Sequence, residues 1–265
     1  MYPRWQLAVK YLKYYLTSSG RKGHGIHSPF VFHFISQVMN DKKNYPAYEK
    51  VENLRKQLIK NKQVLAIDDF GAGSSLGKSN IRTVAAIAKN SVKPKKIAQI
   101  LFRMIREYQP NTILELGTSL GITTSYLSLA KPDSNVTTME GAKEVAAIAK
   151  NNFALMGFQN ISMREGNFDD TLSVVISQLS SVDFAFIDGN HRQEPTERYF
   201  QQLLSKKNND SILVFDDIHW SREMEQTWET IQKHPSVRCT IDLFFIGIVF
   251  FREEFQEKQH FRIRF

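Results

Sequence analysis

The chain has 265 residues, 42% hydrophobic and 12% aromatic against 23% charged, which is enough apolar surface for a folded core and excludes a disordered protein. Its longest uninterrupted apolar run, from Leu243 to Phe251, is about half of what a membrane-spanning helix needs, so the sequence predicts no membrane span. The first residues do not form a signal-peptide pattern, and the single cysteine, Cys239, permits no internal disulfide. We therefore expect a cytoplasmic protein.

The charge is unevenly distributed along the chain. Residues 1–111 carry 20 Lys and Arg against 6 Asp and Glu, whereas residues 112–265 carry 15 against 21. Two interpretations of the basic front stay open. It consists either of solvated helix faces whose lysines aid solubility, or of a surface for an anionic partner such as a substrate, a nucleic acid or a phospholipid.

Residues 1–95 are predicted to form a basic, mainly helical cap. Apolar residues at three-and-four spacing indicate a helix over residues 3–17, and Ser28 with Pro29 marks the start of another that runs to about Val38. Further helices are expected at residues 47–61, 81–89 and 96–108, with a short strand-like run at 64–67.

Residues 96–265 are predicted to form the core, because short apolar strands alternate there with helices. This pattern indicates a mostly parallel sheet with helices on both faces, a Rossmann-like α/β fold. Two final runs are too close together for a crossover, so they must form an antiparallel hairpin. The tail, residues 261–265, could add to an edge. The seven predicted strands are residues 112–116, 135–139, 161–164, 182–187, 211–215, 237–243 and 246–252.

Glycines and polar residues follow the first three of these strands. Residues 115–121, Glu-Leu-Gly-Thr-Ser-Leu-Gly, join the first strand to a helix, and such a loop lets a ligand approach the backbone and the helix N-terminus. A tight turn also needs glycine, so the loop alone is weak evidence. The second strand ends in Glu140-Gly141, where a carboxylate can accept ribose hydroxyls. Asn167 and Phe168 follow the third strand and suit a nucleobase.

Residues 105–123, IREYQPNTILELGTSLGIT, and residues 137–140, TTME, resemble the cofactor motifs of class I methyltransferases that use S-adenosylmethionine, of the catechol O-methyltransferase type. The resemblance spans about residues 95–252. It implies S-adenosylmethionine as the cofactor, with Glu140 at the ribose and Asn167 and Phe168 beside the adenine. Around the methionine part it implies Glu115, Gly117, Gly121 and Thr123. Thr118, Ser119 and Gly141, within the same turns, are also expected to bind the cofactor.

A second glycine-rich segment, Ala72 to Ser79, satisfies a relaxed P-loop pattern and makes a nucleotidase a remote alternative. The first loop position is Ala rather than Gly, and Asp68 and Asp69 would repel phosphates. Too little sheet precedes residue 112 for an independent nucleotidase domain. We therefore expect a surface turn or a lid over the active site.

Acidic residues follow the fourth and fifth predicted strands, at Asp188 and at Asp216-Asp217. Their oxygens could converge on one hard cation, Mg²⁺ or else Mn²⁺ or Ca²⁺. The resemblance supports such a site, since metal-dependent O-methyltransferases use an Asp after the fourth strand and an Asp-Asn pair after the fifth. Asp217 stands where that family has Asn. His191 occupies the position of the catalytic lysine of the catechol enzymes.

We therefore take His191 as the base that removes the proton of a hydroxyl substrate, and Asp188 as a catalytic residue beside it. The alternative is that Asp188 only contacts the cofactor, that Asp216 and Asp217 cap turns, and that His191 and His219 are packed polar residues.

The sequence thus predicts O-methylation of a small molecule by a monomer or homodimer. The competing hypothesis is metal-independent methylation of a nitrogen or of a nucleic acid, using the basic N-terminal region.

Overall fold

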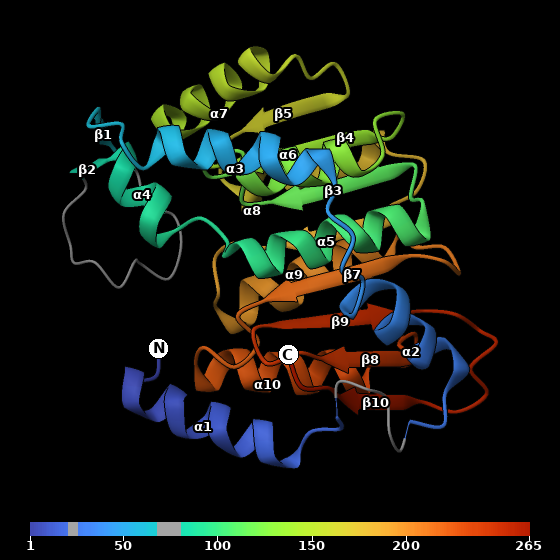
Figure 1. Ribbon diagram of the computed structural model, residues 1–265. Helices are drawn as coiled ribbons and strands as arrows, with labels where there is room; N and C mark the ends of the chain where they lie inside the picture. Colours follow the sequence, from blue (N-terminus) through green and yellow to red (C-terminus); the bar gives the residue numbers. More distant parts are fainter. Residues whose placement is uncertain (21–25, 68–80) are drawn as a thin grey trace. The chain divides into compact units, whose positions relative to one another are not determined.

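The computed structural model describes residues 1–20, 26–67 and 81–265, which divide into two compact units (Figure 1). Unit 1 combines Met1–Asn40 with Ile176–Phe265, and unit 2 is Asp41–Val175. The predicted separation into a cap up to residue 95 and a core from residue 96 is a different division and stays a prediction. None of the helices within the described ranges has the length and hydropathy that crossing a membrane requires.

Unit 2 contains a set of parallel strands and the helices that follow them. Its elements in chain order are α3 (Pro46–Leu58), β1 (Val64–Ala66), β2 (Ile81–Thr83), α4 (Val84–Asn90), α5 (Lys95–Tyr108), β3 (Thr112–Leu116), α6 (Ile122–Ala130), β4 (Asn135–Glu140), α7 (Lys143–Met156) and β5 (Ile161–Glu165). Helix α8 (Phe168–Gln178) crosses the boundary to unit 1. Strands β3, β4 and β5 pair in parallel, with Leu116 opposite Met139 and Glu140 opposite Glu165. The loops after these strands therefore leave the sheet at one edge.

Helix α3 of the predicted cap and helix α5 at the start of the predicted core both pack on α6 (Figure 1). The rings of Tyr48, Phe102 and Tyr126 meet there, with centroids 5.0 to 6.3 Å apart. The Tyr126 hydroxyl donates a hydrogen bond of 2.9 Å to the Glu52 carboxylate. Burial and the contact with Glu52 raise the pKa of Tyr126, so this phenol stays a donor. The helix that follows the first glycine loop is thereby held by aromatic packing and a partly buried hydrogen bond.

The helix predicted over residues 81–89 begins later than expected. Ile81–Thr83 form β2, which pairs antiparallel with β1, and α4 begins only at Val84, after the Thr83 hydroxyl has accepted a hydrogen bond from the Ala86 amide. The β-branched Ile81 and Thr83 favour this extended pairing. The P-loop pattern at residues 72–79 lies outside the described residues. The described elements on either side of it, β1 and β2, pair antiparallel.

Unit 1 takes elements from both ends of the chain. They are α1 (Arg4–Thr17), α2 (Pro29–His33), the π-helix η1 (Phe34–Met39), β6 (Phe184–Ile187), α9 (Gln193–Leu204), β7 (Ile212–Asp216), α10 (Arg222–Lys233), β8 (Cys239–Asp242), β9 (Ile246–Phe250) and β10 (Gln259–Arg262). The strand order within the unit is β10-β8-β9-β7-β6. Strands β6 and β7 are parallel, whereas β9 runs antiparallel to both β7 and β8.

These pairings confirm the predicted mostly parallel α/β fold with its terminal hairpin. In unit 1 the described residues form one strand more than predicted, because Gln259–Arg262 form β10 and pair in parallel with β8. The tail therefore does add to an edge, two residues earlier than the alternating segment suggested.

The helix predicted to start at Ser28 is an α-helix only for its first turn. The Ser28 hydroxyl accepts from the Val31 amide and Pro29 occupies the first helical position, as expected. From Phe34 to Met39 the helix widens to π geometry, which buries Phe34, Ile35, Val38 and Met39 together. A helix with 3.6 residues per turn would not place all four on one side as closely.

Candidate functional site

The first glycine loop folds back over the end of the neighbouring strand β4. The amides of Gly117 and Thr118 both donate to the Met139 carbonyl, each at 3.0 Å. Gly117 has a φ of 105° and Ser119 a φ of 49°. Since side chains disfavour such angles, Gly117 is required by the backbone itself. The loop is thus held in one conformation by the strand beside it.

A fully buried carboxylate, Glu115, lies beneath this loop. It accepts a hydrogen bond of 2.6 Å from the Thr138 hydroxyl and another from the Thr124 hydroxyl. The hydroxyls of Thr118 and Thr138 are also 2.6 Å apart. Buried carboxylates are costly unless they are hydrogen-bonded, and these hydroxyls fulfil that condition. The network connects β3, β4 and α6 under the loop.

Glu140, the predicted ribose ligand, connects two backbone segments. Its Oε2 accepts from the Ser119 amide at 2.8 Å, and its Oε1 accepts from the Ala142 amide at 2.9 Å. The turn between Glu140 and Ala142 contains Gly141. A carboxylate has about four acceptor positions, so these two bonds are compatible with further hydrogen bonds to a ligand.

Gly121 is required for packing, whatever its role toward a cofactor. Its φ is 79°, and a Cβ atom there would come within 2.5 Å of the Phe153 ring on α7. Thr123, in the first turn of α6, is buried. A glycine at this point of a strand–turn–helix unit commonly serves close packing. The sequence interpretation attributed Gly121 to the ligand and did not include this contact.

Asn167 and Phe168 are placed by the turn after β5. The side-chain Oδ1 of Asn167 accepts from the Asp169 amide at 3.1 Å. The backbone carbonyl of Asn167 accepts from the Thr171 amide at 3.0 Å. Phe168 is half-buried at the start of α8. Gly166, with a φ of 129°, donates to the Glu140 carbonyl. Backbone hydrogen bonds thus connect the three predicted cofactor loops of unit 2.

In unit 1, three ionisable side chains converge after β6 and β7. Asp188, His191 and Asp216 each offer a ligand atom, and these atoms all lie within 4.8 Å of one another. Asp188 follows β6 and Asp216 ends β7, and the two strands pair in parallel with Ile187 opposite Phe215. Asp216 is buried, whereas Asp188 and His191 are half-buried. Parallel pairing therefore brings the predicted acids to one edge.

The turn that carries His191 has an unusual backbone. Asn190 and His191 both have positive φ, 68° and 42°, and the His191 amide donates to the Gly189 carbonyl at 2.9 Å. The Asn190 amide group donates to the hydroxyl of the buried Tyr199 at 3.1 Å, which holds the turn against α9. Such conformations persist only where the surroundings fix them, and they are frequent at functional sites.

Asp217 differs from the other two aspartates. Its φ is 54° and its amide donates to the Phe245 carbonyl at 2.7 Å, so the chain turns sharply at this residue. Asp217 is half-buried and does not belong to the converging group. Of the predicted ligand set Asp188, Asp216 and Asp217, the structure brings together the first two, and His191 is the third member.

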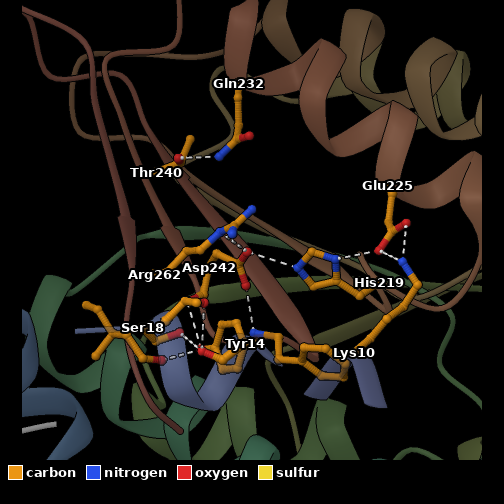
Figure 2. Close-up of polar contacts among 12 residues, drawn as sticks. Lys10, Tyr14, Ser18, His219, Glu225, Gln232, Thr240, Asp242 and Arg262 are labelled. Atoms are coloured by element: carbon orange, nitrogen blue, oxygen red, sulfur yellow. Dashed lines mark hydrogen bonds and ion pairs between the residues drawn. The ribbon is translucent and has the colours of Figure 1, made fainter. Parts of the chain in front are cut away.

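His219, two residues further on, belongs to a polar network that sequence reasoning did not find (Figure 2). Its Nδ1 is 3.2 Å from the Glu225 carboxylate and its Nε2 is 2.9 Å from that of Asp242. Glu225 also accepts from Lys10 at 2.9 Å and from the Tyr2 hydroxyl at 2.8 Å. Although burial acts in the opposite direction, these hydrogen bonds hold the pKa of Glu225 below its ordinary value. No sequence signal connects residues so far apart.

Comparisons with known proteins agree with the predicted resemblance. Residues 114–218 match the family model described as a methyltransferase domain. A catechol O-methyltransferase of Niastella koreensis is 28% identical over 148 residues, which are 54% of this chain and 65% of that protein. The match therefore spans slightly less than two thirds of the length of that relative.

Solved structures confirm the fold. A SAH-bound methyltransferase of Podospora anserina superposes with a TM-score of 0.60 at 12% identity, over 82% of this chain and 93% of that one. An O-methyltransferase of Bacillus cereus in complex with SAH gives 0.54 at 19% identity, over 83% and 97%. At these identities the likeness bears on the architecture of the chain.

Proposed function

We propose that this chain, whose residues 114–218 match a methyltransferase domain, is a class I, S-adenosylmethionine-dependent enzyme that transfers a methyl group to a hydroxyl of a small molecule with the help of a divalent cation. The observation that carries the proposal is the convergence of Asp188, His191 and Asp216 after β6 and β7. The catechol O-methyltransferase relative and the O-methyltransferase among the structural neighbours support oxygen as the acceptor atom.

Unit 2 supplies the residues for the cofactor in this proposal. S-adenosylmethionine, when bound, supplies the methyl group on a sulfonium. Gly117 lets the backbone approach the methionine part, for which Glu115, Thr118, Ser119, Gly121 and Thr123 form the loop, its support and the helix start. Glu140 and Gly141 serve the ribose, and Asn167 with Phe168 serves the adenine. The hydrogen bonds among these loops support a pre-formed site, because little ordering remains for binding.

The residues present in unit 1 fit a divalent cation. Two ligand atoms on opposite sides of an ion, each about 2.1–2.4 Å from it, are at most about 4.8 Å apart. The ligand atoms of Asp188, His191 and Asp216 all lie within 4.8 Å of one another, so one ion can reach all three. Two carboxylates favour Mg²⁺, Mn²⁺ or Ca²⁺, and the imidazole shifts the preference toward Mn²⁺. A bound cation supplies a Lewis acid that lowers the pKa of a hydroxyl group. Asp188 and Asp216 would hold it.

His191 is proposed to accept the proton of the substrate hydroxyl. Its Nε2 lies 3.5 Å from Oδ1 of Asp188, close enough for that carboxylate to stabilise the imidazolium that proton transfer creates. The positive φ at Asn190 and His191 sets the direction in which the His191 side chain leaves the backbone. If the same nitrogen binds the cation instead, it cannot also accept the proton. A titration that compares the metal affinity of His191→Ala with that of the wild type distinguishes the two roles.

The test combines a lysate with a labelled cofactor. Wild-type protein is incubated with S-adenosylmethionine that carries a labelled methyl group, and the small-molecule fraction is analysed by mass spectrometry. We expect a labelled methyl ether that disappears with excess chelator and returns with Mn²⁺ or Mg²⁺. Label in nucleic acid, or on nitrogen and insensitive to chelator, would instead support metal-independent methylation through the basic N-terminal region.

A further inference from the structure

Helix α1 is held to unit 1 by its inward face. Tyr14 is buried, and its hydroxyl donates to the carbonyls of Asp242, at 3.1 Å, and of Ile263 (Figure 2). Lys10 makes an ion pair of 2.9 Å with Glu225. The hydroxyl of Tyr11 donates to the Phe265 carbonyl at 2.9 Å. These contacts fix the rotation of the helix about its own axis.

The opposite face of α1 is apolar and exposed. Trp5 and Tyr14 are nine positions apart, which is about two and a half turns, so they lie on opposite sides of the helix. Around Trp5 lies a stripe of large apolar side chains, which we call the outer stripe and which are 59% to 70% exposed: Met1, Trp5, Val9, Leu12 and Leu16.

The outer stripe is unusual for this protein. Of the twelve large hydrophobic side chains that are exposed in the described residues, six belong to residues 1–16. A helix that is apolar on two opposite faces is normally covered on both, and a contiguous apolar patch on a surface indicates an interaction site.

Cations border the outer stripe. Lys13 and Arg4 are exposed and lie about a quarter turn from Trp5, one on either side. On the same side as Arg4, the guanidinium of Arg264 lies 4.9 Å from the ring centroid of Tyr15. Residues 1–40 include five Lys and Arg and not a single Asp or Glu. An apolar stripe with a cation on either side, Arg4 and Lys13, is complementary to a surface that is apolar inside and anionic outside.

We propose that α1 docks the protein on an anionic phospholipid surface, lying in the plane of the membrane with the outer stripe in the acyl boundary. Trp and Leu on one face with cations at its margins are typical of interfacial helices, and long basic side chains reach back to the phosphates. A second copy of the chain fits less well. Packing two outer stripes together would bring Lys13 of one copy to the side of Lys13 or Arg4 of the other, with no acid on the helix to compensate.

The test uses vesicles and needs no substrate. Wild-type protein is sedimented with vesicles of phosphatidylcholine alone, or mixed in equal parts with phosphatidylglycerol. We expect binding to the mixed vesicles that weakens as salt is raised, and little binding to the neutral ones. The tryptophan emission should shift to the blue on binding, and this shift should be absent in Trp5→Phe.

Matched variants separate the outer stripe from general effects. Leu12→Gln and Leu16→Gln should each weaken vesicle binding by about tenfold. Leu155→Gln, at an apolar side chain of α7 that is 82% exposed, should leave it unchanged. Lys13→Glu should reduce binding to the anionic vesicles more than Lys62→Glu, which makes the same charge change on unit 2. Circular dichroism and the unfolding temperature verify that each variant is folded.

Two results would overturn the proposal. One is a folded wild-type protein that does not bind the mixed vesicles. The other is a dimer in light scattering that Leu12→Gln dissociates, without vesicle binding, since the outer stripe would then join two copies of the chain.

Discussion

The Nε2 atom of His219 lies 2.9 Å from Oδ2 of Asp242, a carboxylate that is almost fully buried. The other oxygen of Asp242, Oδ1, accepts from the Phe244 amide at 2.8 Å. Nε of Arg262 lies 3.6 Å from Oδ2. Because His219 is in the loop after β7, these contacts connect that loop to β8 and β10. That loop follows directly after Asp216, the last residue of β7.

The first prediction concerns Gly117. With a φ of 105°, Gly117→Ala strains the loop and adds a methyl group where the cofactor would approach. We expect binding of S-adenosylhomocysteine, measured by calorimetry, to weaken at least about tenfold, with a stability loss of about 1–2 kcal/mol.

Gly157→Ala is the control for strain alone. Gly157 also has a positive φ, 74°, but it ends α7 with open space around the position of a Cβ atom. The Gly157→Ala variant should lose about as much stability as Gly117→Ala and keep the wild-type affinity for S-adenosylhomocysteine. Equal loss of affinity in both variants would contradict a cofactor role for Gly117.

The second prediction concerns the metal. Each carboxylate repels its neighbours while no cation is bound, so Asp216→Asn should keep or raise the unfolding temperature without metal and abolish the increment that Mn²⁺ or Mg²⁺ adds. Asp217→Asn should retain that increment, since Asp217 is outside the converging group. Asp210→Asn, at an exposed aspartate paired with Arg252, is the control. An unchanged increment in Asp216→Asn would remove Asp216 from the ligand set.

The third prediction distinguishes the two roles of His191. If His191 is the base, His191→Ala should lower kcat by about 10²–10⁴-fold, less so as pH rises and the substrate hydroxyl ionises unaided. Metal affinity, measured by calorimetry, should stay within a few fold. A large loss of metal affinity instead identifies His191 as a ligand and would refute its role as base.

The fourth prediction concerns the pH dependence of stability. The pKa of Glu225 in the folded protein is below its ordinary value, so its contacts with Lys10, Tyr2 and His219 stabilise the fold above that value. The stabilisation is lost as pH falls through the folded pKa. Glu225→Gln should cost about 1–2 kcal/mol at pH 7, and the difference in unfolding temperature should shrink below about pH 4.

Glu229→Gln on the same helix is the control for Glu225. Its pair with Lys233 is exposed and 3.7 Å long, so the variant should unfold within about 0.5 kcal/mol of wild type across the pH range. A pH-independent gap for Glu225→Gln would mean that shape rather than charge makes the contribution.

Local sequence patterns predicted most of the strands but not every element. The strands from Thr112 to Asp216 are short apolar runs between turn residues, and each lies within two residues of its predicted bounds. Ile81–Thr83 was predicted as helix because Val84–Asn90 continues a helical spacing, while its partner strand at Val64–Ala66 is remote in sequence. Pairing with a distant strand overrides local propensity.

The candidate site shows the same division. The aspartates after β6 and β7 were predictable, since parallel strands bring their carboxyl ends together. The third member of the converging group is His191 rather than Asp217. This outcome depends on the positive φ angles at Asn190, His191 and Asp217. Asn, His and Asp adopt positive φ more often than other residues with side chains, but still uncommonly, so the residue types alone do not predict these angles.

Unit 1 combines segments from both ends of the chain, and this affects the order in which the protein can fold during synthesis. Residues that hold α1, such as Glu225, Asp242 and Ile263, leave the ribosome more than 200 residues after it, at about 5–20 residues per second. Unit 2 is continuous in sequence and can be complete before them. We therefore expect α1 to stay unpacked during translation, with both of its faces accessible to chaperones. Pulsed hydrogen exchange on stalled chains should detect protection of the unit 2 amides first.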